Sequence, residues 1–327
     1  DAASRAPVVF VQLPQEAIED PTGRWLGRYV LDGVDFIVQA AATLLRPKMG
    51  HKQKPQVVIN VSWGPQTGPH DGSSLLELAL SERVKAFEKS LDLHLVVPSG
   101  NSHEARAHAQ WPASKGCDAL HWHVAPDADH LQFLEIWWPA GTTNGNTRLS
   151  VMSPDGRTWH NHDDKHQGQH GLFEGTAGAW LVVVPHPGAH GNRQMALRAL
   201  APTRCEAGRT CPPHGRWTVA IEKDPERDDA ELVHVYVARN SANMGGRRRG
   251  RDGYLFDPAY EATRHGRWPR REPDASIVRR EGTLSGLATG AATTVTGGYV
   301  LAKEKDSEEL AAPYTSSGTG AGTRGRR

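Results

Sequence analysis

The clearest pattern of apolar positions lies in the first hundred residues and predicts a strand, a helix and a second strand. Residues 56–61 are nearly continuous in β-branched side chains, as expected of a strand covered on both faces in a parallel sheet. Residues 93–97 predict the second strand. Between them, apolar residues recur at helical spacing over 74–87, and Ser74 with Glu77 can form a capping box.

An earlier strand and helix complete the first part of the chain. Residues 7–13 (PVVFVQL) predict a strand, and the apolar spacing over 24–45 predicts a helix that Asp20 or Thr22 can cap. Strands and helices therefore alternate, which is the signature of an α/β fold with a parallel sheet and covering helices. Loops at the carboxyl ends of such strands bind ligands, and Asn101 stands in one of them.

The pattern changes after Asn101. From about residue 116 to 237 the chain consists of short runs rich in aromatic and β-branched residues, separated by turn signals. Because no helical stretch lies between these runs, we expect an antiparallel β-sandwich of jelly-roll type. We expect most of the tryptophans in this region to lie in its core. They are Trp122, Trp137, Trp138, Trp159, Trp180 and Trp217.

The last part of the chain is basic and then rich in small residues. Arginines gather at 247–251 and 264–280, but acidic residues dilute their charge, so we interpret this stretch as a solvated linker. Residues 282–301 are glycine-rich and predict a buried return strand in tight contact with the sheet. The expected domains are an α/β core over 1–115, an inserted β-sandwich over 116–245 and a return to the core over 246–327.

Composition excludes some partners. The 38 basic and 37 acidic residues nearly cancel, so no general attraction to nucleic acid or to a membrane surface follows. No apolar run reaches the roughly 18 residues needed to span a bilayer. The first residues, DAASRAPVVFVQLPQ, lack the layout of a signal peptide and are expected to be cut within a domain. The oligomeric state does not follow from the sequence.

Three cysteines are too few for a disulfide scaffold. Cys205 and Cys211 are close enough in a loop to bridge, while Cys117 is left single. A disulfide there would indicate an oxidising compartment, and two reduced thiols are an equal alternative.

Histidines and aspartates cluster between residues 160 and 170, with His160 as the first of them. Imidazoles and carboxylates are metal ligands, so a metal site is one hypothesis for this cluster. However, the stretch is typical of a solvated loop, and we expect no metal there.

Three segments together resemble the central part of the subtilases, the subtilisin-like serine peptidases. They are N-x-S-W-G at 60–64, the loop T-G-P-H-D-G-S-S at 67–74, and the S-G-N turn at 99–101. Residues 311–318 (AAPYTSSG) also resemble the segment that precedes the nucleophile in many subtilases. The resemblance implies a subtilisin-like fold, and it makes the adjacent histidine and aspartate at 70–71 loop-shaping residues and not a catalytic dyad.

The resemblance also implies roles for individual residues. In subtilases the S-x-G segment pairs with the substrate backbone, and the asparagine of the S-G-N turn donates its amide to the oxyanion. A preorganised donor there lowers the barrier by roughly 3–4 kcal/mol. The alternative is that the asparagine only closes a turn, since asparagine tolerates left-handed backbone conformations. By motif, the oxyanion donor is Asn101 and the substrate-binding residues are Ser62, Trp63, Gly64, Ser99 and Gly100.

The three catalytic motifs of the family are absent from this chain. A subtilase carries Asp in D-[ST]-G, His in H-G-T and Ser in G-T-S-x-A-x-P, which together form the triad. Asp20 in D-P-T-G is a superficial match, and Ser316 and Ser317 precede the expected nucleophile. We therefore expect truncation at both ends, and we expect this chain by itself to be inactive.

The sequence thus predicts the central fragment of a serine endopeptidase that hydrolyses proteins or peptides through an acyl-enzyme. No cofactor is expected, although structural calcium in the complete protein would agree with the family, which also favours an extracytoplasmic location. The alternative is a non-catalytic protein whose β-sandwich binds a glycan or a protein. A nucleotide-binding protein is disfavoured, because neither G-x-G-x-x-G nor a P-loop motif occurs.

Overall fold

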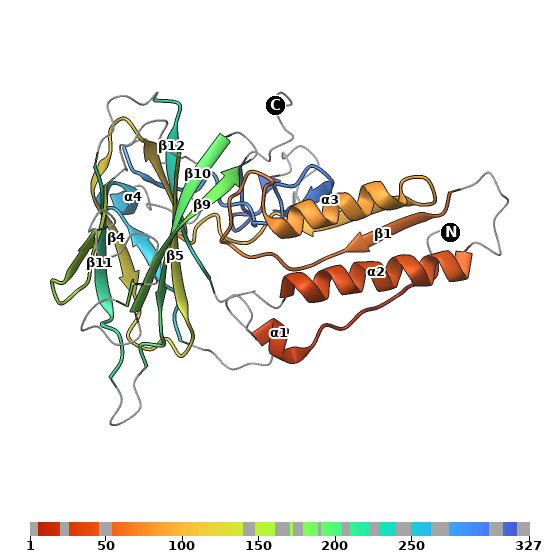
Figure 1. Ribbon diagram of the computed structural model, residues 1–327, viewed down its shortest axis with the longest axis horizontal. Helices are drawn as coiled ribbons and strands as arrows, with labels where there is room; N and C mark the ends of the chain where they lie inside the picture. Colours follow the sequence, from red (N-terminus) through yellow and green to blue (C-terminus); the bar gives the residue numbers. More distant parts are fainter. Residues whose placement is uncertain are drawn as a thin grey trace.

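The structure is a computed structural model that combines one parallel and two larger antiparallel sheets (Figure 1). Figure 1 shows the parallel sheet and its helices at one end of the molecule and the two antiparallel sheets at the other. β16 (Tyr299–Val300) and β17 (Leu310–Ala311) pair with each other in a separate two-stranded sheet. The residues described are 6–19, 26–45, 54–139, 148–160, 171–172, 179–188, 191–204, 210–222, 229–239, 250–262, 275–300 and 310–318.

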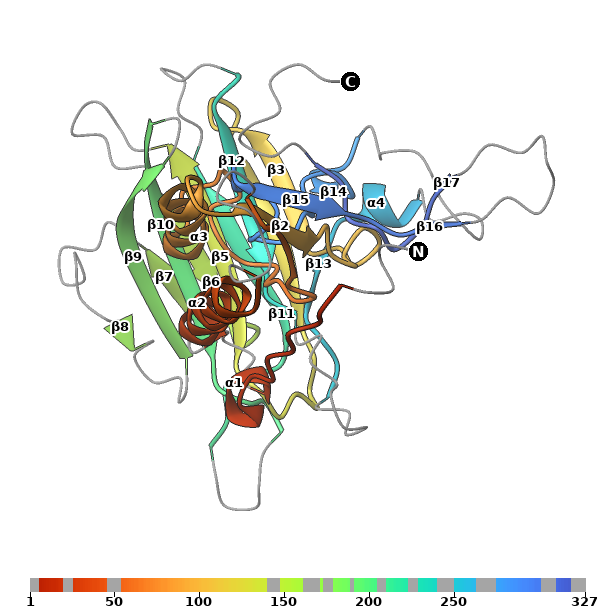
Figure 2. The ribbon, with the colours of Figure 1, turned by 90° about the vertical axis from the view of Figure 1, so that its right-hand side faces the viewer.

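The parallel unit consists of three strands and two helices. Its strands run in the order β1 (Gln56–Asn60), β2 (Asp92–Pro98) and β15 (Thr293–Thr296). Helices α2 (Leu26–Leu45) and α3 (Leu75–Phe87) lie side by side on one face of this sheet (Figure 2). Apolar side chains from both helices and from alternate positions of β1 and β2 share one core, which is what fixes the helices to the sheet.

Both long helices predicted from apolar spacing are confirmed. The amino terminus of α3 is capped as expected, because the backbone N–H of Glu77 donates to Ser74 Oγ at 3.2 Å. The Ser74 hydroxyl donates in turn to Glu77 Oε2 at 2.7 Å. A bidentate ion pair between Arg83 and Asp35 then joins α3 to α2. Local signals were sufficient here because caps and periodicity act within a few residues.

Two expectations about this unit were wrong, and a third was right only in part. Residues 7–13 form no strand: they run as irregular chain before α1 (Gln15–Glu19), and Phe10 is 81% exposed. A β-branched run becomes a strand only when another strand pairs with it, and no described strand does so here. β1 is covered on one face only, since its pattern alternates and Val58 is 62% exposed.

The buried return strand predicted over 282–301 is confirmed only in part, because residues 283–289 are buried and β15 returns to the parallel sheet, but most of the range is not strand. Residues 281–290 form turns and loop instead, and only β15 pairs with the parallel sheet. The residues of β15 are themselves largely exposed. In this segment serine and threonine side chains form hydrogen bonds with backbone groups that a strand would use for pairing. Thr283 Oγ1 donates to the Arg280 carbonyl at 2.7 Å, and Ser285 Oγ accepts from Leu287 N–H at 3.3 Å.

The antiparallel unit comprises two sheets packed face to face. In the described residues one sheet has seven strands and the other five, and a short helix, α4 (Pro258–Ala262), closes against them. The seven-stranded sheet runs β14 (Val278–Arg279), β3 (His108–Pro112), β12 (Leu232–Val237), β5 (Gln132–Pro139), β10 (Gly191–Leu200), β9 (Ala179–Gly188) and β8 (Gly171–Leu172). The five-stranded sheet runs β13 (Tyr254–Phe256), β4 (Cys117–Val124), β11 (Gly215–Ile221), β6 (Leu149–Met152) and β7 (Thr158–His160).

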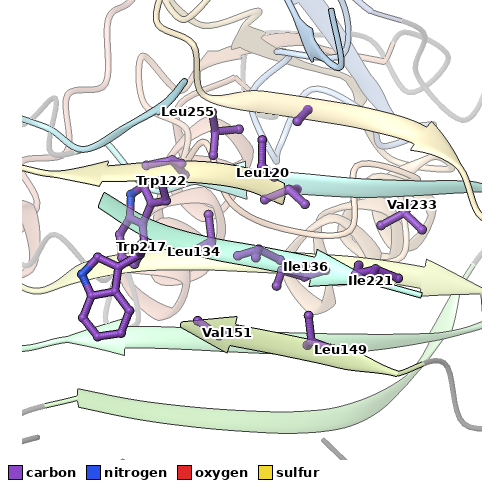
Figure 3. Close-up of a cluster of buried hydrophobic side chains, with 14 of the residues drawn as sticks. Leu120, Trp122, Leu134, Ile136, Leu149, Val151, Trp217, Ile221, Val233 and Leu255 are labelled. Atoms are coloured by element: carbon purple, nitrogen blue, oxygen red, sulfur yellow. The ribbon is translucent and has the colours of Figure 1, made fainter. Parts of the chain in front are cut away.

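The core of this unit lies between its two sheets. Alternate residues of β4, β5, β11 and β12 point inward, and the indoles of Trp122 and Trp217 are fully buried with ring centroids 6.4 Å apart (Figure 3). Trp138 packs into the same core. The expectation that most of these tryptophans lie in the core is confirmed for four of the six, since Trp159 also belongs to it. Trp137 is buried on the other face of its sheet, and the side chain of Trp180 lies outside the described residues.

Strand pairing extends the antiparallel unit beyond the region 116–245. Seven runs of aromatic and β-branched residues in that region form β4, β5, β6, β9, β10, β11 and β12, but β3 precedes the region and β13 and β14 follow it. β3 joins because β12 pairs with it along five residues, a contact between segments far apart in sequence. The sequence pattern could not reveal this pairing, because β3 by itself is a short run with no turn signal on its amino side.

The expected solvated linker ends in a buried residue. Arg280 is fully buried; its Nε donates to Glu104 Oε1 at 3.0 Å and its guanidinium lies 4.5 Å from the Tyr260 ring centroid. A buried arginine requires such partners. Residues 247–249 and 264–274 of the basic runs lie outside the described residues.

Two further sequence predictions fall partly outside the described residues. Cys211 is disulfide-bonded and Cys117 is free, while Cys205 is not described. Of the histidine-rich cluster only His160 is described, so the metal hypothesis for that cluster stays a prediction. None of the described helices combines the length and apolar character needed to cross a bilayer.

Candidate functional site

The two predicted substrate loops leave the parallel sheet at the same edge. β1 and β2 are parallel with Asn60 opposite Val96, and the pairing continues as Val61 N–H donates to the Val96 carbonyl at 2.9 Å. Residues 62–64 therefore follow β1 where residues 99–101 follow β2. This is the carboxyl edge of the sheet, the usual location of ligand sites in α/β folds.

Asn101 presents its side chain to solvent at this edge. The left-handed position in the turn belongs to Gly100, with φ of 103°, whereas the described non-glycine residues with positive φ are His70 and Arg106. The turn-closing explanation for Asn101, which relies on left-handed backbone, therefore does not apply. Its carbonyl accepts from Arg239 Nη1 at 3.2 Å, and its amide forms no hydrogen bond to a described residue.

The S-G-N turn is held from beneath by the segment around Ser316. The Ser316 N–H donates to the Gly100 carbonyl at 3.0 Å, and Ser316 Oγ accepts from Ser102 N–H at 2.9 Å. On the other side, Ser99 N–H donates to the Thr296 carbonyl at 2.7 Å. These contacts place the turn without using the Asn101 amide. The motif at 311–318 includes Ser316, but nothing in the motif indicates that it supports this turn.

A bridging segment, residues 283–286, fixes the spacing between the two loops. The Ser285 N–H donates to the Ser99 carbonyl at 2.7 Å, and the Gly286 N–H donates to the Pro65 carbonyl at 2.7 Å. Gly64 packs so closely on this segment that an added Cβ would lie 1.8 Å from Ser285 Oγ. The glycine-rich composition of this stretch was the one sequence signal of such a close approach.

Gly64 is a strong structural test of this arrangement. Replacing Gly64 with Ala should lower the free energy of unfolding by about 1–3 kcal/mol, because the methyl group overlaps the Ser285 side chain. Urea unfolding followed by tryptophan fluorescence measures the change. The double variant Gly64→Ala, Ser285→Gly should recover most of the loss.

Gly27 provides the matched control for that substitution. A Cβ at Gly27, which lies in α2, would be 3.6 Å from Leu76, an ordinary contact. Gly27→Ala should therefore leave stability unchanged or raise it, since alanine favours helix over glycine by roughly 1 kcal/mol. Equal stability of Gly64→Ala and the native chain would contradict the close packing described here.

The S-W-G residues divide between surface and core. Ser62 is exposed, and its hydroxyl accepts from Asn60 Nδ2 at 2.8 Å. Trp63 is partly buried against the core of the parallel unit. This division leaves the Ser62 side of the segment open while Trp63 anchors it, which suits a segment that receives an extended ligand.

Two serines contact histidines near these loops, and among the described residues neither belongs to a Ser-His-Asp arrangement. Ser317 Oγ lies 3.4 Å from His103 Nδ1, but among the described residues no carboxylate forms an ion pair with His103. Burial lowers the pKa of His103 below its ordinary value. Ser73 is buried and its hydroxyl lies between Asp71 and His186, whereas in a triad the imidazole occupies the middle position.

Metal ligands do not gather at this edge in the part of the chain that is described. No three histidine, cysteine, aspartate or glutamate side chains there are grouped so that they could hold a metal ion. The described residues at this edge offer groups for hydrogen bonding: the exposed Asn101 amide and the backbone of the two loops.

Comparisons with known proteins provide information about the fold. No family model matches the chain, and no curated protein matches it in sequence. Among solved structures, the chain is similar to the Clostridium perfringens CspB protease, with a TM-score of 0.59 and 15% identity. The match covers 90% of this chain and 49% of that protein, so the chain spans about half of its length. At this identity the likeness concerns the fold alone, which is mixed α/β in the present chain.

Proposed function

We propose that this chain is the central part of a subtilisin-like serine endopeptidase. The observation that carries the proposal is the Asn101 amide, which is exposed and has no described hydrogen-bond partner at the carboxyl edge of the parallel sheet. The S-x-G segment follows β1, the strand next to β2, which is the order of these two motifs in the family. The protease-like fold adds support, and the coarse function that follows is peptide-bond hydrolysis.

In the proposed mechanism the described residues bind the substrate and stabilise charge. An extended peptide would pair with the backbone of residues 62–64 and 99–100, as an added strand pairs with a sheet edge. When a serine attacks the scissile carbonyl, negative charge develops on its oxygen, and the Asn101 amide donates to it. The same donor would serve both formation and hydrolysis of the acyl-enzyme.

The triad in this proposal comes from segments outside the present chain. Aspartate, histidine and serine must be supplied by D-[ST]-G, H-G-T and G-T-S-x-A-x-P motifs, none of which occurs here. The present chain alone is expected to be inactive. No cofactor enters the mechanism.

The antiparallel unit is, in this proposal, a β-sandwich of jelly-roll type inserted into the peptidase core. The expected insertion covers residues 116–245, with core on either side. Support comes from the parallel pairing of β15 with β2, since the chain returns to the first sheet after leaving the antiparallel strands. The strands β3, β13 and β14 lie outside residues 116–245 in sequence and pair with its sheets.

Sequencing the gene beyond both ends tests the proposal directly. The expected result is D-[ST]-G and H-G-T upstream and G-T-S-x-A-x-P downstream, followed by cleavage of unfolded protein substrates by the complete product. Labelling of that product by a fluorophosphonate, which reacts with activated serines, should accompany cleavage. A start and a stop codon at the present ends would overturn the proposal.

The alternative is a binding protein whose sandwich holds a glycan through exposed tryptophans. This alternative has less support, because the five tryptophan side chains described in that region are buried. Full burial agrees with a structural role for them.

A further inference from the structure

The loop that follows the S-x-G segment packs on the outward face of the seven-stranded sheet. We call residues 65–73 the interface loop. On β5, the residues at even positions 134, 136 and 138 point into the core between the sheets, so Glu135 and Trp137 point toward this loop. The contact therefore joins the candidate substrate segment to the antiparallel unit.

Glu135 is the central contact of this interface. The Gly68 N–H donates to Glu135 Oε2 at 2.8 Å, and the Trp137 indole N–H donates to the same oxygen at 3.1 Å. Burial raises the pKa of Glu135, while these two hydrogen bonds lower it. A carboxylate in a strand that faces a packed loop is costly unless such donors satisfy it.

His70 provides a second contact with the same sheet. Its ring stacks on Tyr236 with centroids 3.9 Å apart and an interplanar angle of 17°. Tyr236 lies directly opposite Glu135 in the pairing of β12 with β5, so the two anchors are neighbours. His70 has a φ of 52°, a left-handed conformation that tertiary contacts must hold in place.

The bridging segment holds the interface loop on its other side. The Pro65 carbonyl accepts from Gly286 N–H, and Gln66 Nε2 donates to the Thr283 carbonyl at 3.3 Å. The loop is thus fixed between the bridging segment and the antiparallel unit. Since Gly64 immediately precedes Pro65, movement of the loop would carry the S-x-G segment with it.

We propose that Glu135 and Tyr236 of the antiparallel unit are positioning residues for the substrate segment Ser62–Gly64. The proposal rests on the peptidase function proposed above and adds a role for the antiparallel unit in it. Pairing of a peptide with a strand requires the segment to be held within about 0.5 Å of its working position. The antiparallel unit supplies part of that support, so it is a component of the cleft and not an independent binding module.

Two substitutions of Glu135 separate positioning from charge. Leucine removes the acceptor of the Gly68 and Trp137 hydrogen bonds, whereas glutamine keeps an acceptor oxygen in a side chain of the same shape. In the complete protein, Glu135→Leu should raise KM for a peptide substrate roughly tenfold with a smaller change in kcat. Glu135→Gln should restore KM to near the native value.

Hydrogen exchange provides a readout that does not depend on catalysis. In the present chain, Glu135→Leu should speed exchange of the Gly68 amide roughly tenfold or more, and Glu135→Gln should not. The control is Glu222→Leu, because Glu222 is an exposed glutamate after β11 whose carboxylate lies 3.7 Å from Arg148 Nη1. It should leave both KM and exchange unchanged.

A second variant approaches the interface from the loop side. Replacing His70 with Asn removes the ring that stacks on Tyr236 but keeps a residue that tolerates positive φ. It leaves the antiparallel unit intact, and it should also speed exchange over the interface loop and raise KM. This variant decides the question if Glu135→Leu fails to fold, which its thermal midpoint would reveal.

The outcomes distinguish this inference from the proposed function. Native exchange at Gly68 in both Glu135→Leu and His70→Asn would overturn the positioning role, as would native KM values in the two variants. A complete protein that cleaves no peptide would overturn the proposed function, and with it the substrate role of the loop. Altered exchange in that case would establish only that Glu135 holds the loop.

Discussion

Replacing Asn101 with Ala in the complete protein is expected to lower kcat by roughly a hundredfold or more while KM changes little. The amide is expected to act on the charge that develops in the transition state and hardly at all on the bound substrate. The side chain is exposed, and the turn is held by backbone contacts from Ser316 and Thr296, so its removal should not disturb the fold.

Two further variants give this prediction its controls. Asn101→Asp keeps the shape but replaces the donor by a carboxylate, which would repel the oxyanion, so kcat should fall at least as far. Gln56→Ala removes an exposed amide at the opposite end of β1 and should leave kcat and KM unchanged. Steady-state kinetics on one peptide substrate measures all three, and native turnover in Asn101→Ala would exclude the oxyanion role.

Acidification is expected to destabilise the chain through His108. Its Nδ1–H donates to the Glu281 carbonyl at 2.6 Å, so in the neutral ring Nε2 accepts from His234 Nδ1 at 3.1 Å. Burial lowers the pKa of His108 from 6.5 to about 4, with a further contribution from the charge of Arg279. The folded chain therefore favours the neutral imidazole more strongly than the unfolded chain does.

The sign and size of the effect follow from that difference. Stability from neutral His108 is fully present above the unfolded pKa near 6.5 and is lost as the pH falls through 6.5 toward 4. The full loss is about 3 kcal/mol, since one pKa unit corresponds to about 1.4 kcal/mol. Between about pH 7 and about pH 4.5, most of it, about 2 kcal/mol, should be seen.

Urea unfolding of the native chain and of His108→Phe at these two pH values measures the contribution. Phenylalanine keeps a ring beside Tyr236, 4.7 Å away, but does not titrate. The variant should be less stable near neutral pH, because it loses two hydrogen bonds, and it should lose less stability on acidification. Equal pH dependence in His108→Phe and the native chain would contradict the prediction.

Elements with a strong local pattern were predicted correctly from the sequence. The helices around 24–45 and 74–87 follow from apolar spacing and from the Ser74 cap, and the seven runs between 116 and 237 all form strands. Residues 7–13 show the limit of such patterns. Their composition is that of a strand, but a strand exists only through its partner, and none among the described strands pairs with them.

The candidate site was also predicted only in part from the sequence. The motifs at 60–64 and 99–101 predicted two neighbouring loops, and the structure places both at one sheet edge because parallel strands end together. The functions of these residues stay predictions until the variants are measured. What no motif indicated is how the loops are held, since their supports come from the bridging segment and from β5.

By itself, then, the sequence determined the local elements, the α/β character of the first hundred residues and the position of Asn101 after a strand, because these depend on periodicity and turn chemistry within a few residues. Only the tertiary structure decided that one face of β1 is open, that Gly64 lies against Ser285, and that Glu135 holds Gly68. Those contacts join residues far apart in the chain, where no local pattern constrains which partner a backbone N–H or a buried carboxylate finds.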